Sequence, residues 1–211
     1  MNLILLGMPG AGKGTQAEFI QKDYGLANIS TGAMMREVSR SESKLASKVQ
    51  TYLSSGTLVP NEIIIEMLVE RIQKDDCSNG FLLDGFPRNL DQGEALDDAN
   101  ISIDLVLYLS IKEEEIISRM SGRRVHLASG RSYHILHNPP KKDGFDDVTG
   151  EALIQREDDN PEVIKKRLSV YYNETEPLLE FYKNKDLKFI EIDASKSVDV
   201  VTDSIRQSIS T

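Results

Sequence analysis

Short apolar runs alternate with amphipathic stretches along this chain. The runs are bounded by turn-forming or charged residues and lie at 3–6, 81–83, 105–109 and 189–192. Between them, apolar residues recur at helical spacing, as in 63–72, where glutamates lie opposite isoleucine and methionine. Buried strands that alternate with helices form crossover units. The pattern therefore predicts an α/β fold in which a parallel sheet is flanked by helices on both faces.

Two regions interrupt this alternation. Residues 30–60 are helical in pattern and polar, whereas 122–159 hold glycine and proline turn signals and the alternation typical of small β-hairpins. A predicted helix at 113–120 precedes the second region, and Asn160-Pro161 is a typical helix start after it. Pro177 is expected to kink or restart that last helix. We interpret the second region as a lid. The alternative is a structureless surface loop, which is uncommon at this length.

The first apolar run leads directly into a glycine-rich segment, Gly7-Met8-Pro9-Gly10-Ala11-Gly12-Lys13-Gly14-Thr15. Its glycines allow backbone N–H groups to turn toward an anion, and the predicted helix at 16–22 directs its positive end to the same place. Lys13 supplies a charge for β- and γ-phosphates. Gly14 stands where a magnesium-binding hydroxyl usually follows the lysine, and Thr15 comes one position later. The segment predicts a nucleoside triphosphate site and gives less support to a GTPase switch.

Composition narrows the class of protein. The chain has 211 residues, a formal charge of −9 and one cysteine, Cys77. This length suits one core domain with inserted subdomains. The acidic balance argues against a nucleic-acid partner, and a single cysteine excludes an internal disulfide and a cysteine-based zinc cluster. No apolar stretch approaches the roughly 20 residues of a membrane span, and the N-terminus lacks the basic segment of a signal peptide. We therefore expect a cytoplasmic protein.

A carboxylate ends the second apolar run. In an open α/β sheet, ligands bind at the carboxyl ends of strands, so Asp84 is a candidate to orient hydrated magnesium beside the phosphate loop. A strand-end aspartate can also be a simple helix cap, but the phosphate loop favours the magnesium role. Gly85-Phe86-Pro87-Arg88 follows at once and adds a guanidinium on a stiff turn.

Arginine recurs where the predicted flaps meet the core. The set is Arg36, Arg88, Arg119, Arg123, Arg124, Arg131, Arg156 and Arg167. Any one alone could be a solvated surface residue, but several lie in the first insertion, beside the crevice or at the two stems of the lid. Planar guanidinium groups suit the spread charge of a transferring phosphoryl group. A phosphate acceptor is already ionised near neutral pH and needs no general base, which agrees with the absence of an obvious catalytic His or Asp.

These motifs together resemble the adenylate kinases, of the bacterial kind with a long lid. The resemblance rests on the phosphate loop, Asp84-Gly85-Phe86-Pro87-Arg88, Gly122-Arg123-Arg124 and Asp146-Asp147-Val148-Thr149-Gly150, and runs from Met1 to about Lys196. It implies a P-loop NTPase-type parallel sheet with inserted AMP-binding and lid subdomains. The implied division is a core (1–29, 60–121 and 160–211), an AMP-binding flap (30–59) and a lid (122–159), in a monomer.

The resemblance also implies roles for individual residues. The expected ATP contacts are Gly10, Ala11, Gly12, Lys13, Gly14, Thr15, Arg119, Arg123, Ser132, Tyr133 and the backbone carbonyl of Lys196. The expected AMP contacts are Thr31, Arg36, Thr57, Leu58, Val59, Gly85, Phe86, Pro87, Arg88, Gln92, Arg156 and Arg167. The expected catalytic set is Lys13, Arg88, Arg123, Arg156 and Arg167.

Two features distinguish this chain within the resemblance. Some relatives hold the lid with four cysteines on zinc, whereas the equivalent positions here are His126, Ser129, Asp146 and Thr149, so a hydrogen-bonded cluster is expected instead of a metal. His137 stands where relatives often place an aromatic ring against the ATP adenine, which leaves the donor base open.

The function expected from this resemblance is reversible phosphoryl transfer from MgATP to AMP, giving two ADP. One alternative is the same chemistry with GTP as donor or another nucleoside monophosphate as acceptor. A second, from a different class, is a nucleotide-binding switch. That class expects a hydroxyl directly after Lys13 and a water-positioning residue, and the sequence offers neither.

Overall fold

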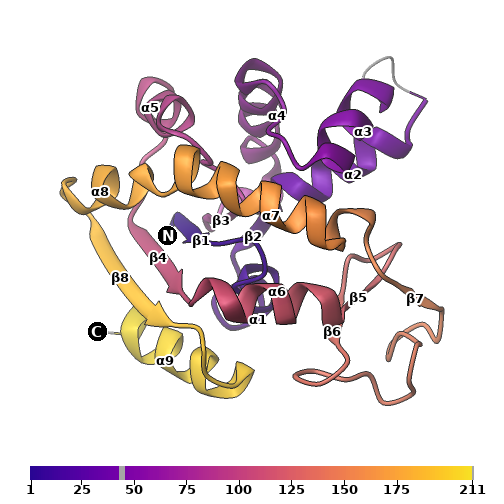
Figure 1. The fold of residues 1–211 in the computed structure, drawn as a ribbon. Helices are drawn as coiled ribbons and strands as arrows, with labels where there is room; N and C mark the ends of the chain where they lie inside the picture. The colour runs from indigo at the N-terminus through magenta and orange to yellow at the C-terminus, as the bar shows by residue number, and fades with distance from the viewer. Residues whose placement is uncertain (43–45, 211) are drawn as a thin grey trace.

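A single parallel sheet organises the chain. The computed structural model describes residues 1–42 and 46–210. Its main sheet has five strands in the order β2-β3-β1-β4-β8, all paired in parallel. Their bounds are β1 Leu3–Gly7, β2 Ala27–Ser30, β3 Phe81–Asp84, β4 Leu105–Ser110 and β8 Lys188–Asp193. Parallel pairing requires crossover connections, and helices supply them (Figure 1).

The helices lie between and around these strands. In chain order they are α1 Lys13–Tyr24, α2 Thr31–Arg40, α3 Ala46–Ser55, α4 Asn61–Ile72, η1 Asp75–Cys77, α5 Leu90–Asp98, α6 Glu113–Gly122, η2 Glu157–Asp159, α7 Pro161–Val170, the π-helical turn η3 Tyr171–Thr175, α8 Pro177–Lys183 and α9 Val198–Ser210. The predicted α/β fold, with helices on both faces of a parallel sheet, is confirmed.

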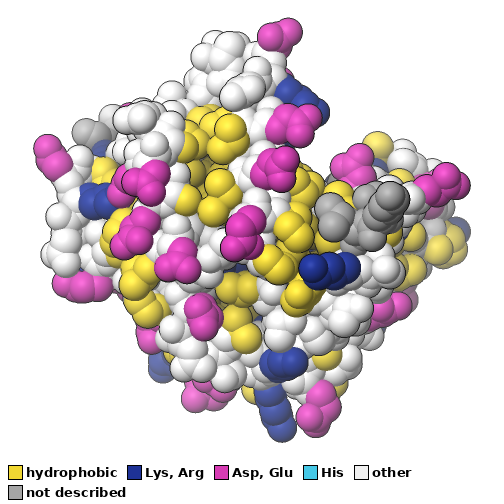
Figure 2. Space-filling model, turned by 90° about the horizontal axis from the view of Figure 1, so that it is seen from above, with side chains coloured by type: hydrophobic (Ala, Val, Ile, Leu, Met, Phe, Trp, Pro, Cys, Tyr) yellow, Lys and Arg dark blue, Asp and Glu magenta, His cyan; other side chains and the backbone are white. Residues whose placement is uncertain are grey.

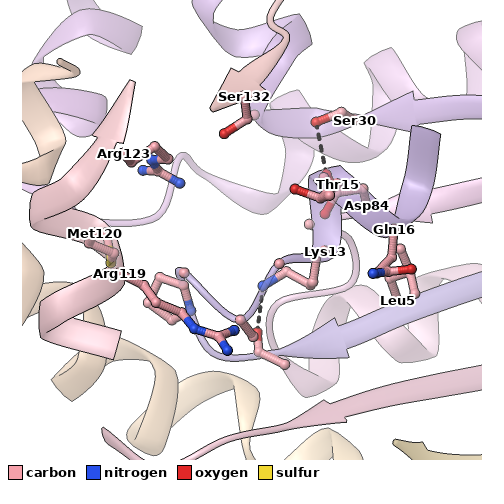
Figure 3. Close-up of a pocket in the computed structure, with 18 of the residues that line it drawn as sticks. Leu5, Lys13, Thr15, Gln16, Ser30, Asp84, Arg119, Met120, Arg123 and Ser132 are labelled. Carbon is pink, nitrogen blue, oxygen red and sulfur yellow. Dashed lines mark hydrogen bonds between the residues drawn. The ribbon is translucent and has the colours of Figure 1, made fainter. Parts of the chain in front are cut away.

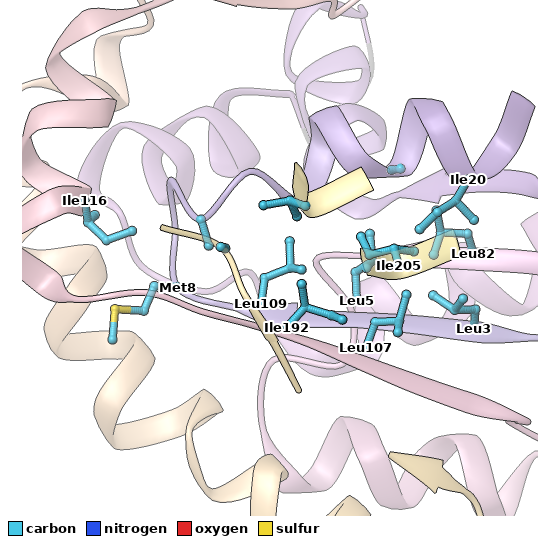
Figure 4. Packing of buried hydrophobic residues seen from close by; sticks show 14 of the residues in the cluster. Leu3, Leu5, Met8, Ile20, Leu82, Leu107, Leu109, Ile116, Ile192 and Ile205 are labelled. Atoms are coloured by element: carbon cyan, nitrogen blue, oxygen red, sulfur yellow. The ribbon is translucent and has the colours of Figure 1, made fainter. Parts of the chain in front are cut away.

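Successive side chains of each central strand pack into two different hydrophobic clusters, one on each face of the sheet. Along β1, Leu3 and Leu5 belong to a cluster that also contains Ile20 of α1 and Ile205 of α9, as Figure 4 shows. Ile4 and Leu6 belong to a second cluster with buried residues of α2, α4 and α8. Side chains alternate across a strand, so β1 is apolar at every position because both faces are covered. Burying one such side chain contributes about 1.5–3 kcal/mol.

The four predicted apolar runs are β1, β3, β4 and β8, and the sequence pattern did not identify β2. Its residues alternate between buried and partly exposed positions and include Asn28, so β2 lacks a continuous apolar run. The helix predicted at 16–22 begins earlier, at Lys13. Within α4, Ile64 and Leu68 are the buried residues. Ile63 and Met67, which were predicted to form the buried face of this helix, are only partly buried and pack against the same cluster as Ile64 and Leu68.

A small second sheet lies apart from the main one (Figure 1). It consists of β5 Arg123–His126, β6 Ser132–His134 and β7 Leu153–Ile154, paired antiparallel in the order β6-β5-β7. The hairpin pattern predicted within 122–159 is therefore confirmed. The chain returns to the core at α7, where the Asn160 side chain accepts from Val163 N at 3.0 Å, and α8 begins at Pro177, as predicted.

The surface reflects the acidic composition. Seen from above, Asp and Glu side chains are spread over the face, with fewer Lys and Arg among them (Figure 2). Among residues 1–42 and 46–210, no helix combines the length and the apolar character that crossing a bilayer requires.

Candidate active site

The phosphate loop takes its shape from three glycines with positive φ. Gly7, Gly10 and Gly12 have φ of 146°, 85° and 96°, a region that other residues rarely adopt. At Gly7 a side chain is also excluded by space, because an added Cβ would lie 2.7 Å from the carbonyl oxygen of Leu109. Gly12 precedes the first residue of α1, so the loop delivers its amides and the positive end of the helix to one point.

Lys13 lies across the loop. Its Nζ donates to the carbonyl oxygens of Gly7 at 2.6 Å and Met8 at 2.8 Å. Burial lowers the pKa of Lys13 to about 8, with nearby arginines adding to the effect and Asp84 opposing it. An ammonium group held in this way is a cation that an anionic ligand would stabilise further.

Asp84 ends β3 beside the loop, as the strand-end argument predicted. Its Oδ2 lies 3.5 Å from the Ser30 hydroxyl and 3.9 Å from a Cβ built on Gly14. Figure 3 shows Asp84 and Thr15 close together on the side of the cavity that also holds Lys13. A carboxylate and hydroxyl groups are hard oxygen donors, and magnesium is typically bound through one or two carboxylates and several waters. The residues present therefore fit magnesium.

A cavity of about 780 Å³ opens at the carboxyl ends of these strands. It is lined by every predicted ATP contact, namely Gly10, Ala11, Gly12, Lys13, Gly14, Thr15, Arg119, Arg123, Ser132, Tyr133 and Lys196. It is also lined by Asp84 and by these predicted AMP contacts: Arg36, Thr57, Leu58, Gly85, Pro87, Arg88, Arg156 and Arg167. The structure thus brings most of the predicted residues to one place.

Four predicted AMP contacts lie outside the cavity lining: Thr31, Val59, Phe86 and Gln92. Gln92 is 0 % exposed, and both ends of its amide are engaged. Its Oε1 accepts from Arg88 N at 2.7 Å, and its Nε2 donates to Asn61 Oδ1 at 2.8 Å. In this conformation Gln92 supports the backbone of Arg88, and its predicted contact with the adenine of AMP stays a prediction.

The guanidinium groups converge on the cavity from several elements, and two aspartates of η2 hold some of them. Arg123 of β5 forms a bidentate pair with Asp159, whose side chain is fully buried. Arg167 of α7 donates to Asp158 at 2.6 Å. Burial opposes ionisation of Asp158, but the surrounding arginines, Arg167 first, hold its pKa below the usual range.

The cations also act on one another. Burial is the main cause that lowers the pKa of Arg36, Arg88, Arg156 and Arg167. Repulsion from neighbouring guanidinium groups lowers the pKa of Arg36, Arg156 and Arg167 further. A concentration of positive charge therefore lies inside a protein of net charge −9. Such a cavity is suited to a polyanion.

Sequence reasoning missed some lining residues. Asp158 could have been found, because acidic residues directly follow Arg156 in the lid stem. His134 gave no signal of its own. Its ring lies 4.4 Å from that of His137, and its Nδ1 accepts from the backbone N–H groups of Leu136 and His137. Burial, with a smaller contribution from His137, lowers the pKa of His134, whose ring borders the cavity near Arg119.

The four predicted lid residues form a hydrogen-bonded cluster. His126 Nδ1 lies 2.7 Å from Ser129 Oγ, and Thr149 Oγ1 lies 3.3 Å from His126 Nε2 and 3.0 Å from Asp146 Oδ2. Arg131 donates to both oxygens of Asp146, at 2.8 and 2.7 Å. Ser129 lies at the cavity border, whereas the other three form cross-links within 122–159, the predicted lid, away from the cavity lining. That this cluster serves in place of a metal stays a prediction.

The fold and the cavity together define a P-loop nucleotide-binding protein of the phosphoryl-transfer class. The adenylate kinase family model matches residues 5–187. A curated relative named Adenylate kinase, from Francisella philomiragia subsp. philomiragia, is 49 % identical over 211 aligned residues, which cover 97 % of this chain and 98 % of the relative. The chain belongs to the adenylate kinase family, as the resemblance indicated. It is accordingly an enzyme of the nucleoside monophosphate kinase class.

Proposed function

We propose that this protein transfers the γ-phosphoryl group of MgATP to AMP, reversibly, to give two ADP. The observation that carries the proposal is a single cavity with a phosphate loop at one wall and arginines from α2, α6, α7, β5 and the turn after β3 around the rest. Two nucleotides meeting end to end by their phosphates match this distribution of charge.

The chemistry requires little covalent help from the protein. An oxygen of the AMP phosphate attacks the γ-phosphorus of ATP, and the bond to the β,γ-bridging oxygen breaks, so that the electron pair leaves with ADP. The attacking phosphate is already ionised, so no side chain has to remove a proton. Lys13, Arg88, Arg123, Arg156 and Arg167 would hold the oxygens in line and stabilise their charge.

Magnesium is the cofactor that this family generally uses with ATP. We propose that Asp84 holds it through water, with the Thr15 hydroxyl nearby, since the oxygen donors fit. Bound there, it would neutralise charge on the ATP phosphates.

We further propose that the chain divides into a core (1–29, 60–121 and 160–211), an AMP-binding flap (30–59) and a lid (122–159) that close over the nucleotides. The separate sheet of 122–159 supports the lid. Contacts between the flap and the lid side support closure: Arg40 Nη1 lies 3.2 Å from Leu127 O, and Gln50 Nε2 lies 3.4 Å from Glu157 Oε2. Residues 43–45 of the flap lie outside the described residues. Closure would exclude water and in part limit turnover. A lid that stays open on a dinucleoside polyphosphate would contradict this.

The test is a coupled ADP assay that crosses ATP and GTP with AMP, GMP, CMP and UMP in the presence of magnesium. We expect rapid ADP formation with ATP and AMP, and its loss in Lys13→Ala and Arg88→Ala with the fold retained. ATP hydrolysis that is slow and unaffected by AMP would overturn the proposal in favour of a nucleotide switch. Faster turnover with GTP as the donor, or with another nucleoside monophosphate as the acceptor, would show a different substrate specificity. For the donor base, His137 would be the first residue to examine. A monomer in the cytoplasm remains part of the proposal.

A further inference from the structure

The backbone of Arg88 is tied to a distant helix. Two of the hydrogen bonds around Arg88 are local: its N–H donates to Gln92 Oε1, and its Nε donates to Gly85 O at 2.8 Å. The third is long-range, because the Thr175 hydroxyl donates to the carbonyl oxygen of Arg88 at 2.7 Å across 87 positions of sequence. The Arg88 main chain is thus held at both its N–H and its C=O.

Thr175 lies at a local break in helix geometry. It is the last residue of η3, the π-helical turn between α7 and α8, in which Glu176 N donates to Tyr171 O at 2.9 Å over five positions. Turns of this kind interrupt the regular side-chain spacing of a helix and are frequent at functional sites. Thr175 and Tyr171 both line the nucleotide cavity. Thr175 therefore lies at the wall of the cavity, at the junction of two helices.

The same helix carries a second guanidinium of the site. Arg167 belongs to α7, about one turn before η3. Burial is the main cause that lowers the pKa of Arg167, and the charges of Arg123 and Arg88 lower it further. The ion pair with Asp158 holds the Arg167 guanidinium, and an anchored Arg88 backbone limits how far the two cations can move apart. The Thr175 hydrogen bond joins the helix of Arg167 to the turn of Arg88.

We propose that Thr175 is a positioning residue of the reaction, which fixes Arg88 relative to Arg167 through the Arg88 carbonyl. The inference rests on the proposed function and concerns the acceptor side, since Arg88 is an expected AMP contact. Thr175 itself carries no charge and donates its only hydroxyl proton to protein, so it acts through Arg88.

The variants are Thr175→Val, which keeps the shape and removes the donor, and Thr175→Ser, which keeps the donor. We expect Thr175→Val to lower kcat/KM for AMP about twofold to tenfold, the range for net loss of one neutral hydrogen bond, and to leave the KM for ATP within about twofold. Thr175→Ser should restore the AMP parameters to within about twofold of the wild type. Ser204→Ala is the matched control, because it removes a hydroxyl that donates to Val200 O at 2.8 Å within α9.

A double-mutant cycle separates positioning from stability. Because Arg88→Ala is expected to abolish turnover, the cycle is measured in the dissociation constant for AMP. In an Arg88→Ala background, Thr175→Val should weaken AMP binding no further, because the group that it positions is gone. Three outcomes would overturn the inference and leave Thr175 with a structural role. They are equal losses of kcat/KM for ATP and for AMP, full additivity of Thr175→Val with Arg88→Ala, and failure of Thr175→Ser to restore the AMP parameters. These outcomes all presuppose a wild-type enzyme that phosphorylates AMP. A wild-type protein without that activity would instead overturn the proposed function.

Discussion

At the scale of residues, the site depends on charged groups held in an unfavourable state until a ligand arrives. Lys13 is the clearest example, because burial lowers its pKa to about 8 while its Nζ donates to the carbonyl oxygens of Gly7 and Met8. Bound phosphates would favour the charged form and raise this pKa again.

Lys13 should therefore take up a proton when nucleotide binds. Near pH 8 the ammonium is about half ionised in the free protein and fully ionised beside phosphates, so ATP binding should consume about half a proton per site. Calorimetric titration in two buffers of different ionisation enthalpy measures this uptake. The uptake should vanish below about pH 6.5, and Lys13→Arg should remove it. Proton release at pH 8 would contradict the assignment.

At the scale of elements, the lid has almost no apolar core of its own and depends on polar cross-links. The carboxylate of Asp146 accepts from Arg131, from the Tyr133 hydroxyl at 3.0 Å and from Thr149 N at 2.8 Å. The Arg131 guanidinium is the main cause that holds the pKa of Asp146 well below its usual range. The folded lid therefore gains stability from this carboxylate above about pH 4, and loses it as the pH falls further.

Asp146→Asn should loosen the lid and leave the core folded. The amide loses the ion pair to Arg131 and presents N–H groups to donors, so hydrogen exchange in 123–154 should speed up about tenfold or more, with little change in the strands of the main sheet. Asp143→Asn, at an exposed position of the same lid, is the control. Equal exchange in the two variants would show that the cluster does not hold the lid together.

In contrast to the lid, strand β4 of the main sheet depends on apolar packing for its stability. Leu107 of β4 is 0 % exposed and packs in the cluster between the sheet and helices α1 and α9. Leu107→Ala should lower the free energy of unfolding by about 2–5 kcal/mol, through lost burial and an unfilled cavity. Denaturant unfolding measures the change. Leu136→Ala, at a 73 % exposed position of the lid, should change it by less than about 0.5 kcal/mol.

At the scale of the whole molecule, the cavity concentrates cations from distant parts of the chain inside an acidic protein. Their mutual repulsion opposes folding in the absence of anions. A ligand that neutralises them should therefore stabilise the entire fold, in addition to closing the flaps.

A dinucleoside polyphosphate that joins two adenosines tests this coupling. At about 100 times its dissociation constant it should add about 2.7 kcal/mol to the free energy of unfolding and raise the Tm by roughly 5–10 °C. The shift should fall as salt is added, because charge attraction contributes to binding. Adenosine, which has no phosphate, is the control ligand. A shift of the same size with adenosine would contradict the role of the cations.

The amino-acid sequence by itself determined the features that depend on neighbouring residues. The glycines with positive φ, the strand before them and the helix after them specify the phosphate loop locally, and Asn160-Pro161 specifies the start of α7. The continuous apolar runs identified β1, β3, β4 and β8. The resemblance to adenylate kinases predicted most of the residues that line the cavity, because the motifs contain these residue types in the family's order.

Only the tertiary structure decided which distant groups meet. β2 escaped detection because its alternating burial depends on neighbours that the chain supplies later. The pairing of Arg123 with Asp159, the engagement of Gln92 by Arg88 and Asn61, and the bond from Thr175 to Arg88 follow from packing of separate elements. A residue type gives a side chain its capacity to bind, but its partner depends on long-range packing that no local pattern encodes.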